Sequence, residues 1–456
     1  MITLVEPKEY IDKLWGNQNY VEDGMYRLMR YVIRMDLDGV VLLHNVITGQ
    51  LIILEKREMQ ALKNSPFSLS EELMDLVSAH FLVPINFDEH LFVVSIRSIL
   101  RKIDSSRQTN YITTYTILPT TNCNARCYYC FEKGARRELM TEETANAVVE
   151  FIARHYDRNR DVYLSWFGGE PTLAADRISQ ICRGLRAGDI YYKSDITTNG
   201  YLFRERMVEE SVDLWNLRSV MISFDGTESS YNRIKRFSAK GISPYKRVME
   251  NIKLLLEKQI NVHVRMNFDI GNYHEFQDLI QDFSDCFKNS MFLNVTVHPI
   301  NGKHLDEDGS LLHGSSDWFD KIVPLLHDIS RKKGFLQISD QLPCLRFKNC
   351  EAASETAVTI TPRGMLVSCP EQFGDDEIKG DIYNGITNQK LVRSWKAIAD
   401  YPKCAKCLLF PYCIRFEKCN VKERCEFRSE LIVTTKLAVM QHYENWRNID
   451  RSKRRI

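Results

Sequence analysis

The sequence predicts an α/β fold in which six parallel strands form most of a barrel, and three observations lead to this expectation. Short β-rich runs alternate with helical patterns, such as 141–156 and 244–259, between residues 113 and 300. Regular alternation of strand and helix implies parallel strands joined by crossovers. The polar and glycine-rich motifs directly follow predicted strands. The carboxyl ends of parallel strands are where such sheets carry their functional residues. The expected strands are 114–120, 162–169, 193–200, 219–226, 262–269 and 292–299.

Composition and charge narrow the class of protein. A chain of 456 residues has room for two or three domains, each with its own core. Its 61 Lys and Arg balance 60 Asp and Glu, so no global field attracts nucleic acid or an anionic membrane. The first residues lack the apolar centre of a signal peptide, and no run of 18 apolar residues occurs. We therefore expect a soluble, cytoplasmic protein with no nucleic-acid or membrane partner.

The 13 cysteines are unevenly distributed along the chain. In a reducing compartment, thiols stay free for metals or catalysis instead of pairing as disulfides. Three lie between residues 123 and 130, and eight between 344 and 425. Cys182 and Cys286 stand alone, and we assign both to packing.

The first cysteine group reads CNARCYYC, with thiols at Cys123, Cys127 and Cys130. A [4Fe-4S] cluster held by three thiolates keeps one iron open to another ligand. Structural zinc instead closes its shell with four ligands, and no nearby His or fourth Cys follows Cys130. This C-x3-C-x2-C pattern, with an aromatic residue before the last cysteine, resembles the signature of the radical S-adenosylmethionine superfamily.

The resemblance implies a cofactor site made from two motifs. Cys123, Cys127 and Cys130 would ligate the cluster, whose open iron would bind S-adenosylmethionine, and Tyr129 would pack by the adenine. Reductive cleavage would give a 5'-deoxyadenosyl radical that abstracts a substrate hydrogen, so the cofactors carry the difficult chemistry. The second motif is GGEP at 168–171: Gly168 and Gly169 would allow close backbone approach, and Glu170 would accept hydrogen bonds from the methionyl ammonium.

Other strand ends offer further contacts to S-adenosylmethionine. The motifs TTNG and SFDG supply polar groups suited to the ribose and methionyl portions. A cationic partner for the carboxylate is also expected, with Arg236 as the first choice and Lys235 and Arg265 behind it. The polar candidates are Thr198, Asn199, Ser223 and Asp225.

The eight C-terminal cysteines could fill two cluster shells. Their G-x4-C and C-x2-C-x5-C spacings resemble the SPASM extension of radical enzymes that modify peptides and proteins. The resemblance implies one auxiliary cluster on Cys344, Cys350, Cys369 and Cys419, and another on Cys404, Cys407, Cys413 and Cys425. Five residues separate Cys413 from Cys419, where three are usual, so the partition of the last ligands stays open. Two four-cysteine zinc sites are the alternative.

Residues 1–105 are expected to form a separate unit. Three strands are predicted within 26–54, followed by a helix with a Ser68-to-Glu71 capping box and a stop at Pro84. A small β-meander beside short helices resembles the winged-helix-like elements that bind leader peptides of ribosomally made, post-translationally modified peptides. A purely structural N-terminal cap is the alternative.

These resemblances imply a partial (β/α)6 TIM-type barrel between two further domains. The expected domains are 1–105 for leader recognition, 106–335 for the radical barrel, 336–430 for SPASM and 431–456 for a helical tail. They imply three [4Fe-4S] clusters, S-adenosylmethionine, a precursor-peptide partner and an electron donor such as a flavodoxin or ferredoxin.

Three functional hypotheses follow. The first is a peptide maturase that forms a cross-link, with cysteine sulfur to carbon favoured over carbon to carbon. The second is formylglycine formation of the anaerobic sulfatase-maturing type. Those enzymes carry an Asp directly after the cysteine matching Cys369, where this chain has Pro370 and then Glu371. The third is a zinc-binding interaction module.

Overall fold

A computed structural model divides the chain into two compact units. One unit comprises residues 109–337 and 350–397, and the other comprises 1–108, 338–349 and 398–456. The structure describes residues 1–15, 24–37, 39–62, 65–106, 111–238, 243–287, 290–300, 316–335, 342–347, 350–397, 402, 404–414, 418 and 428–453.

The first unit is built on six parallel strands, which confirms the α/β fold expected from the sequence. In the sheet they follow the order β13-β12-β11-β10-β9-β8, so each neighbours the next along the chain. Successive side chains of a strand point to opposite faces of the sheet. In β10, every second residue is accordingly buried, and the residues between them are half-buried. The strands are β8 (Thr114–Thr120), β9 (Val162–Gly168), β10 (Tyr192–Thr198), β11 (Leu217–Phe224), β12 (Asn261–Phe268) and β13 (Leu293–Pro299).

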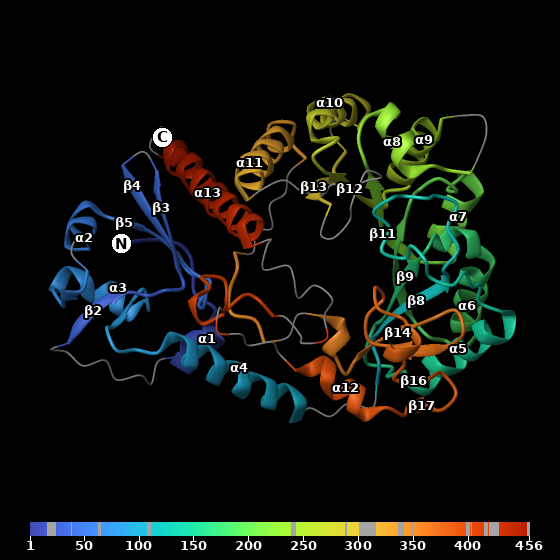
Figure 1. Ribbon diagram of the computed structural model, residues 1–456, viewed down its shortest axis with the longest axis horizontal. Helices are drawn as coiled ribbons and strands as arrows, with labels where there is room; N and C mark the ends of the chain where they lie inside the picture. Colours follow the sequence, from blue (N-terminus) through green and yellow to red (C-terminus); the bar gives the residue numbers. More distant parts are fainter. Residues whose placement is uncertain are drawn as a thin grey trace. The chain divides into compact units, whose positions relative to one another are not determined.

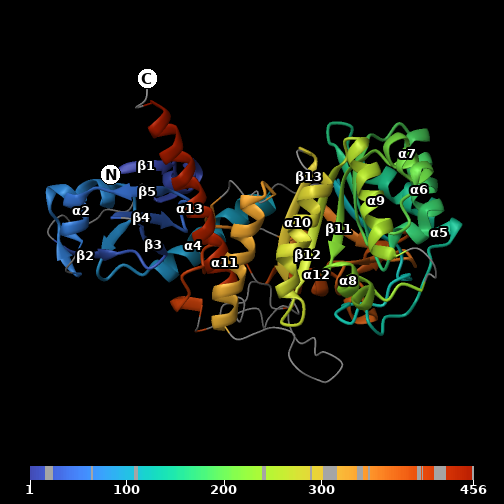
Figure 2. The ribbon, with the colours of Figure 1, turned by 90° about the horizontal axis from the view of Figure 1, so that it is seen from above.

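Helices cover the outer side of this sheet (Figures 1 and 2). In α5, Thr141 caps the first turn by accepting from the backbone of Thr144, and Val148, Phe151 and Ile152 form the buried face. The helices are α5 (Glu142–Arg154), α6 (Ala175–Ala187), α7 (Glu205–Asp213), α8 (Glu228–Lys235), α9 (Pro244–Glu257), α10 (Phe276–Phe287) and α11 (Ser316–Lys332).

Residues 350–397 extend the sheet beyond β8. Strand β14 (Ala357–Ile360) pairs parallel with β8, and three short antiparallel strands continue from it. Helix α12 (Gln389–Lys396) follows. The three strands are β15 (Met365–Val367), β16 (Gly380–Asp381) and β17 (Gly385–Ile386).

The second unit contains two antiparallel sheets. One has the order β1-β5-β4-β3 and the other β6-β2-β7. The strands are β1 (Ile2–Val5), β2 (Met25–Leu28), β3 (Val32–Leu37), β4 (Val40–Asn45), β5 (Leu51–Leu54), β6 (Phe67–Ser68) and β7 (Leu82–Pro84). The helices are α1 (Glu9–Trp15), α2 (Lys56–Ala61), α3 (Met74–Ser78), α4 (Glu89–Ser106) and α13 (Arg428–Lys453).

The core of this second unit includes segments from late in the chain. Leu345, Leu409 and Phe410 are buried in the same cluster as residues of the N-terminal strands. Ala438, Val439 and Tyr443 of helix α13 pack against residues of the β1-β5-β4-β3 sheet. Figure 1 shows α13 beside this sheet. The contacts therefore divide the predicted 336–430 segment between the two units.

The predicted helix before Pro84 is wrong in its bounds. Ser68 lies in β6, and no side-chain capping bond forms at Ser70, where a short 3-10 turn leads into α3. The chain reverses at His80, whose φ is +61°, and Pro84 ends strand β7 instead of a helix. Long-range pairing of β6 and β7 with β2 overrides the local helical pattern.

Helices suited to crossing a membrane are absent from the part of the chain that the structure describes.

Candidate active site

The three cysteines of the first group lie in the loop that follows β8. Cys123, Cys127 and Cys130 are all half-buried free thiols. The backbone of Arg126 donates to the Lys235 carbonyl at 2.7 Å, and Cys130 N donates to the Cys127 carbonyl at 3.3 Å. The loop is therefore held at the carboxyl end of the sheet, as predicted.

The two glycines of GGEP allow β9 to end against this loop. Gly168 has a φ of +114°, and a Cβ there would lie 2.4 Å from the Thr120 carbonyl oxygen. A Cβ on Gly169 would lie 2.4 Å from the Asn122 carbonyl oxygen. No side chain fits so close to backbone, so the glycines let the segment before Cys123 pack on the end of β9.

Glu170 is fully buried, and four hydrogen bonds hold its carboxylate. Oε1 accepts from the backbone and hydroxyl of Thr172 and, at 2.7 Å, from the hydroxyl of Thr198. Oε2 accepts from the backbone of Asn199 at 2.8 Å. Burial raises the pKa of Glu170, and these hydrogen bonds oppose that rise. Each oxygen is therefore fixed in position before any ligand arrives.

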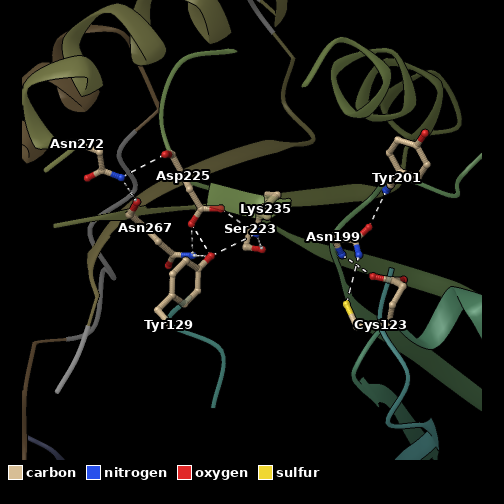
Figure 3. A network of polar contacts seen from close by, with 10 residues as sticks. Cys123, Tyr129, Asn199, Tyr201, Ser223, Asp225, Lys235, Asn267 and Asn272 are labelled. Carbon is tan, nitrogen blue, oxygen red and sulfur yellow. Dashed lines mark hydrogen bonds and ion pairs between the residues drawn. The ribbon is translucent and has the colours of Figure 1, made fainter. Parts of the chain in front are cut away.

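Asn199 connects Glu170 with the cysteine loop, and Figure 3 shows its side chain beside Cys123. Its side-chain nitrogen donates to Asn124 at 2.7 Å and lies 3.9 Å from the Cys123 sulfur. Its side-chain oxygen accepts from the backbone of Tyr201 at 3.0 Å. The strand ends of β9 and β10 thus join Cys123 in one network.

Asp225 and Lys235 form a buried ion pair at the end of β11. Lys235 Nζ lies 2.8 Å from Asp225 Oδ2 and donates to the Ser223 hydroxyl at 2.6 Å. The Tyr129 hydroxyl and the Asn267 amide donate to Asp225 Oδ1, so the aromatic residue before Cys130 ends in this network (Figure 3). Burial opposes the charge on Lys235, but the adjacent carboxylate holds its pKa well above the ordinary value.

Arg236 lies apart from this network. It is exposed, has a φ of +47° and donates from Nε to the Arg233 carbonyl at 3.3 Å. Lys235, the second choice from the sequence, is 2% exposed and contacts the predicted residues Ser223, Asp225 and Tyr129. Lys235 is therefore a cation within this network, whereas Arg236 is on the surface. Arg265 lies on β12, beside His263.

Sequence reasoning missed Glu132, two residues after Cys130. Both of its carboxylate oxygens are buried with no hydrogen-bond partner among the described residues. Burial raises the pKa of Glu132 to about 7. With Phe131, Glu371 and Phe373 it lines a cavity of about 320 Å³. Only its position directly after the cysteine motif could have indicated a role.

The C-terminal cysteines are divided between the two units. Cys344 lies in the unit that contains the N-terminal sheets, whereas Cys350 and Cys369 lie in the barrel unit. Cys419 and Cys425 lie outside the described residues. Within the described part of the chain, no three His, Cys, Asp or Glu side chains are placed to hold one metal ion. The partition into two auxiliary clusters stays a prediction.

A short loop in the second unit carries Cys404, Cys407 and Cys413. Arg97 of α4 anchors this loop. The buried Arg97 guanidinium donates to the backbone carbonyls of Phe410 and Cys413 at 2.6 and 2.8 Å, and stacks on the Phe410 ring. The fixed loop presents three thiols from one segment, a donor set suited to an iron–sulfur cluster that takes its fourth ligand from elsewhere.

The loop after β8 fits a [4Fe-4S] cluster with one open iron. Its donor set is three half-buried thiols within eight residues, without the four ligands of a structural zinc site. Such a cluster would, once loaded, supply an electron to a ligand bound at its open iron.

Comparison with known proteins finds a family model that covers most of the barrel strands. Residues 117–283 match the family model described as the Radical SAM superfamily. The chain therefore contains a radical SAM domain and is an enzyme, and this superfamily implies a 4Fe-4S cluster and S-adenosylmethionine. A zinc-binding interaction module is thus the wrong class for this protein.

Two curated proteins are similar in sequence to this chain. The radical SAM cyclopropyl synthase TigE of Paramaledivibacter caminithermalis is 20% identical over 69% of this chain and 69% of its own length. The sporulation killing factor maturation protein SkfB of Bacillus subtilis is 27% identical over 38% of this chain and 39% of its own.

Two solved structures share the fold. That of anSMEcpe with bound AdoMet has a TM-score of 0.57 and 16% identity, covering 72% of this chain and 98% of that one. Streptococcus suis SuiB bound to its precursor peptide SuiA has a TM-score of 0.50 and 14% identity, covering 87% and 94%. Both support the partial barrel predicted from the strand pattern.

Proposed function

We propose that this enzyme is a peptide maturase that joins a cysteine sulfur to a carbon within a ribosomally made precursor. The maturation protein SkfB and the peptide-bound SuiB support a peptide substrate. S-adenosylmethionine is the two-electron oxidant of the net reaction. The C–H bond breaks, the thiolate forms the C–S bond, and methionine and 5'-deoxyadenosine are released.

The observation that carries this proposal is the cavity beside the cysteine loop. Phe131 and Glu132 enter it directly after Cys130, and Glu371 enters it two residues after Cys369. An extended peptide brings unpaired backbone N–H groups, which need acceptors once they leave water. The carboxylate of Glu371, an exposed residue of this lining, would accept such hydrogen bonds, and Glu132 adds a second, buried carboxylate beside the cavity. The cavity would thus hold a peptide against the site of radical chemistry.

The cofactor contacts proposed from the sequence remain consistent with this geometry. Lys235 would replace Arg236 as the cation that organises the site. The residues that would surround S-adenosylmethionine are Tyr129, Gly168, Gly169, Glu170, Thr198, Asn199, Ser223 and Asp225. Because Asp225 already bonds to Tyr129 and Lys235, its role would be to orient these two side chains.

Two auxiliary clusters are also part of the proposal. They would accept the electron released when the C–S bond forms, and a flavodoxin or ferredoxin would supply the electron that starts each turnover. The proposed ligands are Cys344, Cys350, Cys369, Cys404, Cys407, Cys413, Cys419 and Cys425.

The N-terminal sheet is the proposed leader-binding element. Strand β3 ends the described β1-β5-β4-β3 sheet. The Tyr31 carbonyl accepts from Val46 N at 2.9 Å, so by alternation Ile33 and Met35 bond to β4 while the N–H of Arg34 faces the free edge. A leader strand added there would gain backbone hydrogen bonds independent of its side chains.

Leader binding is best tested on this edge. Deletion of residues 1–105 would also expose Leu345, Leu409 and Phe410, which share the core of that unit. Arg34→Pro removes one edge N–H, whereas Arg34→Ala retains it. With a short, cysteine-rich precursor sought among the neighbouring genes as the probe, we expect Arg34→Pro to weaken binding at least about tenfold, the effect of 1.4 kcal/mol. Equal binding by both variants would contradict this role of β3.

The product of the intact enzyme tests the reaction itself. Each sulfur-to-carbon cross-link should lower the peptide mass by two hydrogens and remove one alkylatable thiol. A carbon-to-carbon link gives the same mass change with a constant thiol count, and formylglycine formation gives an aldehyde. Either of those results would replace the thioether proposal by one of its alternatives.

A further inference from the structure

A second cavity in the barrel unit lies between α5, α12 and the β14–β17 extension. Its volume is about 230 Å³. Liquid water takes about 30 Å³ per molecule, so the space holds a ligand of roughly seven non-hydrogen atoms. The walls are largely apolar, with Ile112, Phe151, Val358, Leu366, Ile386 and Val392 among the lining residues.

Lys379 is buried in this cavity, and only 4% of its surface is exposed. Its backbone is fixed, because its N–H donates to Leu366 at 2.8 Å and its carbonyl accepts from Thr387 and Asn388, both at 2.9 Å. No described residue accepts a hydrogen bond from its ammonium. A buried ammonium without a partner is costly, so the site favours an anion.

The charges around the cavity leave one positive charge uncompensated. Lys396 pairs with Glu355, and both line the same cavity as Lys379. His155, the remaining titratable group of the lining, bonds through Nδ1 to the Phe151 carbonyl at 2.8 Å. Burial, helped by Lys396, lowers the pKa of Lys379 to about 8, which agrees with this local excess of positive charge.

We propose that this cavity binds a small aliphatic carboxylate, with its charged end on Lys379 and its tail against the apolar wall. A single ammonium in an apolar space suits a monoanion with a short tail, whereas a phosphate dianion needs more donors. The carboxylate would belong to a free short-chain acid or to the C-terminus of a peptide. This site is independent of the proposed peptide cross-linking.

The test is calorimetric titration of anaerobically prepared holoenzyme with butyrate. We expect saturable binding with a dissociation constant of about 1 mM, or about −4 kcal/mol. Lys379→Met should weaken it at least tenfold and raise the melting temperature, because the variant no longer buries an unpaired charge. Lys390→Met is the control, since Lys390 is an exposed lysine of helix α12 that does not line the cavity. Butyramide, which has the same shape without charge, should not bind.

A second measurement needs no variant. Butyrate should protect Lys379 of the wild-type holoenzyme from amine acetylation, read by mass spectrometry, while leaving Lys390 reactive. Tighter binding of N-acetylglycine, which ends in a peptide-like carboxylate, would assign the ligand to a peptide terminus, and binding of butyrate alone would assign it to a free acid. Absence of saturable butyrate binding, equal binding by Lys379→Met, or equal binding of butyramide would overturn the proposal.

Discussion

The cysteines after β8 and the cysteines between 344 and 425 differ in how the fold brings them together. The first three thiols lie on one loop, and the carboxyl ends of β8, β9 and β10 hold that loop within one unit. Of the later group, Cys344 and Cys369 belong to different units. A site on one strand end is fixed by local geometry, whereas a dispersed site depends on how distant segments come together.

The largest expected effect separates the two groups directly. Changing Cys123, Cys127 and Cys130 together to Ala should remove about four of about 12 irons and abolish cleavage of S-adenosylmethionine. Changing Cys404 and Cys407 to Ala should remove about four irons but retain some 5'-deoxyadenosine production. The exposed Cys286→Ala is the control and should change neither quantity. Continued 5'-deoxyadenosine production in the triple variant would contradict the assignment.

Gly169→Ala tests whether the end of β9 positions the loop. The new Cβ would lie 2.4 Å from the Asn122 carbonyl oxygen, so the segment before Cys123 must move. We expect loss of the barrel cluster, measured as iron content, because overpacking costs about 1–3 kcal/mol. At Gly188 the nearest atom to an added Cβ is 3.6 Å away, so Gly188→Ala should keep its iron. Normal iron in both variants would show that the loop tolerates the displacement.

Lys235 and Arg236 provide a matched pair of adjacent cations. Lys235→Met leaves the Asp225 carboxylate buried without its partner and should lower the free energy of unfolding by about 3–5 kcal/mol. The exposed Arg236→Met should change it by no more than about 0.5 kcal/mol. Denaturant unfolding measures both. A weaker affinity for S-adenosylmethionine in stable Arg236→Met alone would restore Arg236 as the cofactor contact.

Glu170→Ala is expected to have a smaller effect, confined to the barrel site. Loss of a charge-assisted hydrogen bond to the methionyl ammonium should cost roughly 1.5–3 kcal/mol, raising the dissociation constant of S-adenosylmethionine one or two orders of magnitude. The donors of Thr172, Thr198 and Asn199 would also lose their acceptor, so some stability should be lost. Unchanged affinity would reduce GGEP to a structural turn.

The sequence predicted the elements whose signals are local. Strand β10 carries a clear alternation, and β8, β9, β10 and β11 each end at a motif, so both these strands and the loop of Cys123 could be located. Lys235 and Arg236 are adjacent in sequence, but Lys235 belongs to the buried face of α8, whereas Arg236 follows the helix in a left-handed conformation and is exposed. Strand β7 could not be predicted, because its pairing with β2 joins residues far apart in the chain.

The role of Glu132 was also beyond local reasoning. A glutamate after a cysteine motif is ordinarily a solvated side chain, and its burial depends on the segment from Thr361 to Ile378 that lines the same cavity. No spacing in the sequence indicates that this later segment returns to the loop.

The metal content of the wild-type protein, purified without oxygen, tests the central claim most directly. Eleven cysteines in two groups should give a brown protein with about 12 iron and about 12 sulfide per chain. Reduction in the presence of S-adenosylmethionine should then yield 5'-deoxyadenosine. A colourless protein that holds two or more zinc ions and little iron, even after anaerobic reconstitution, would contradict this account.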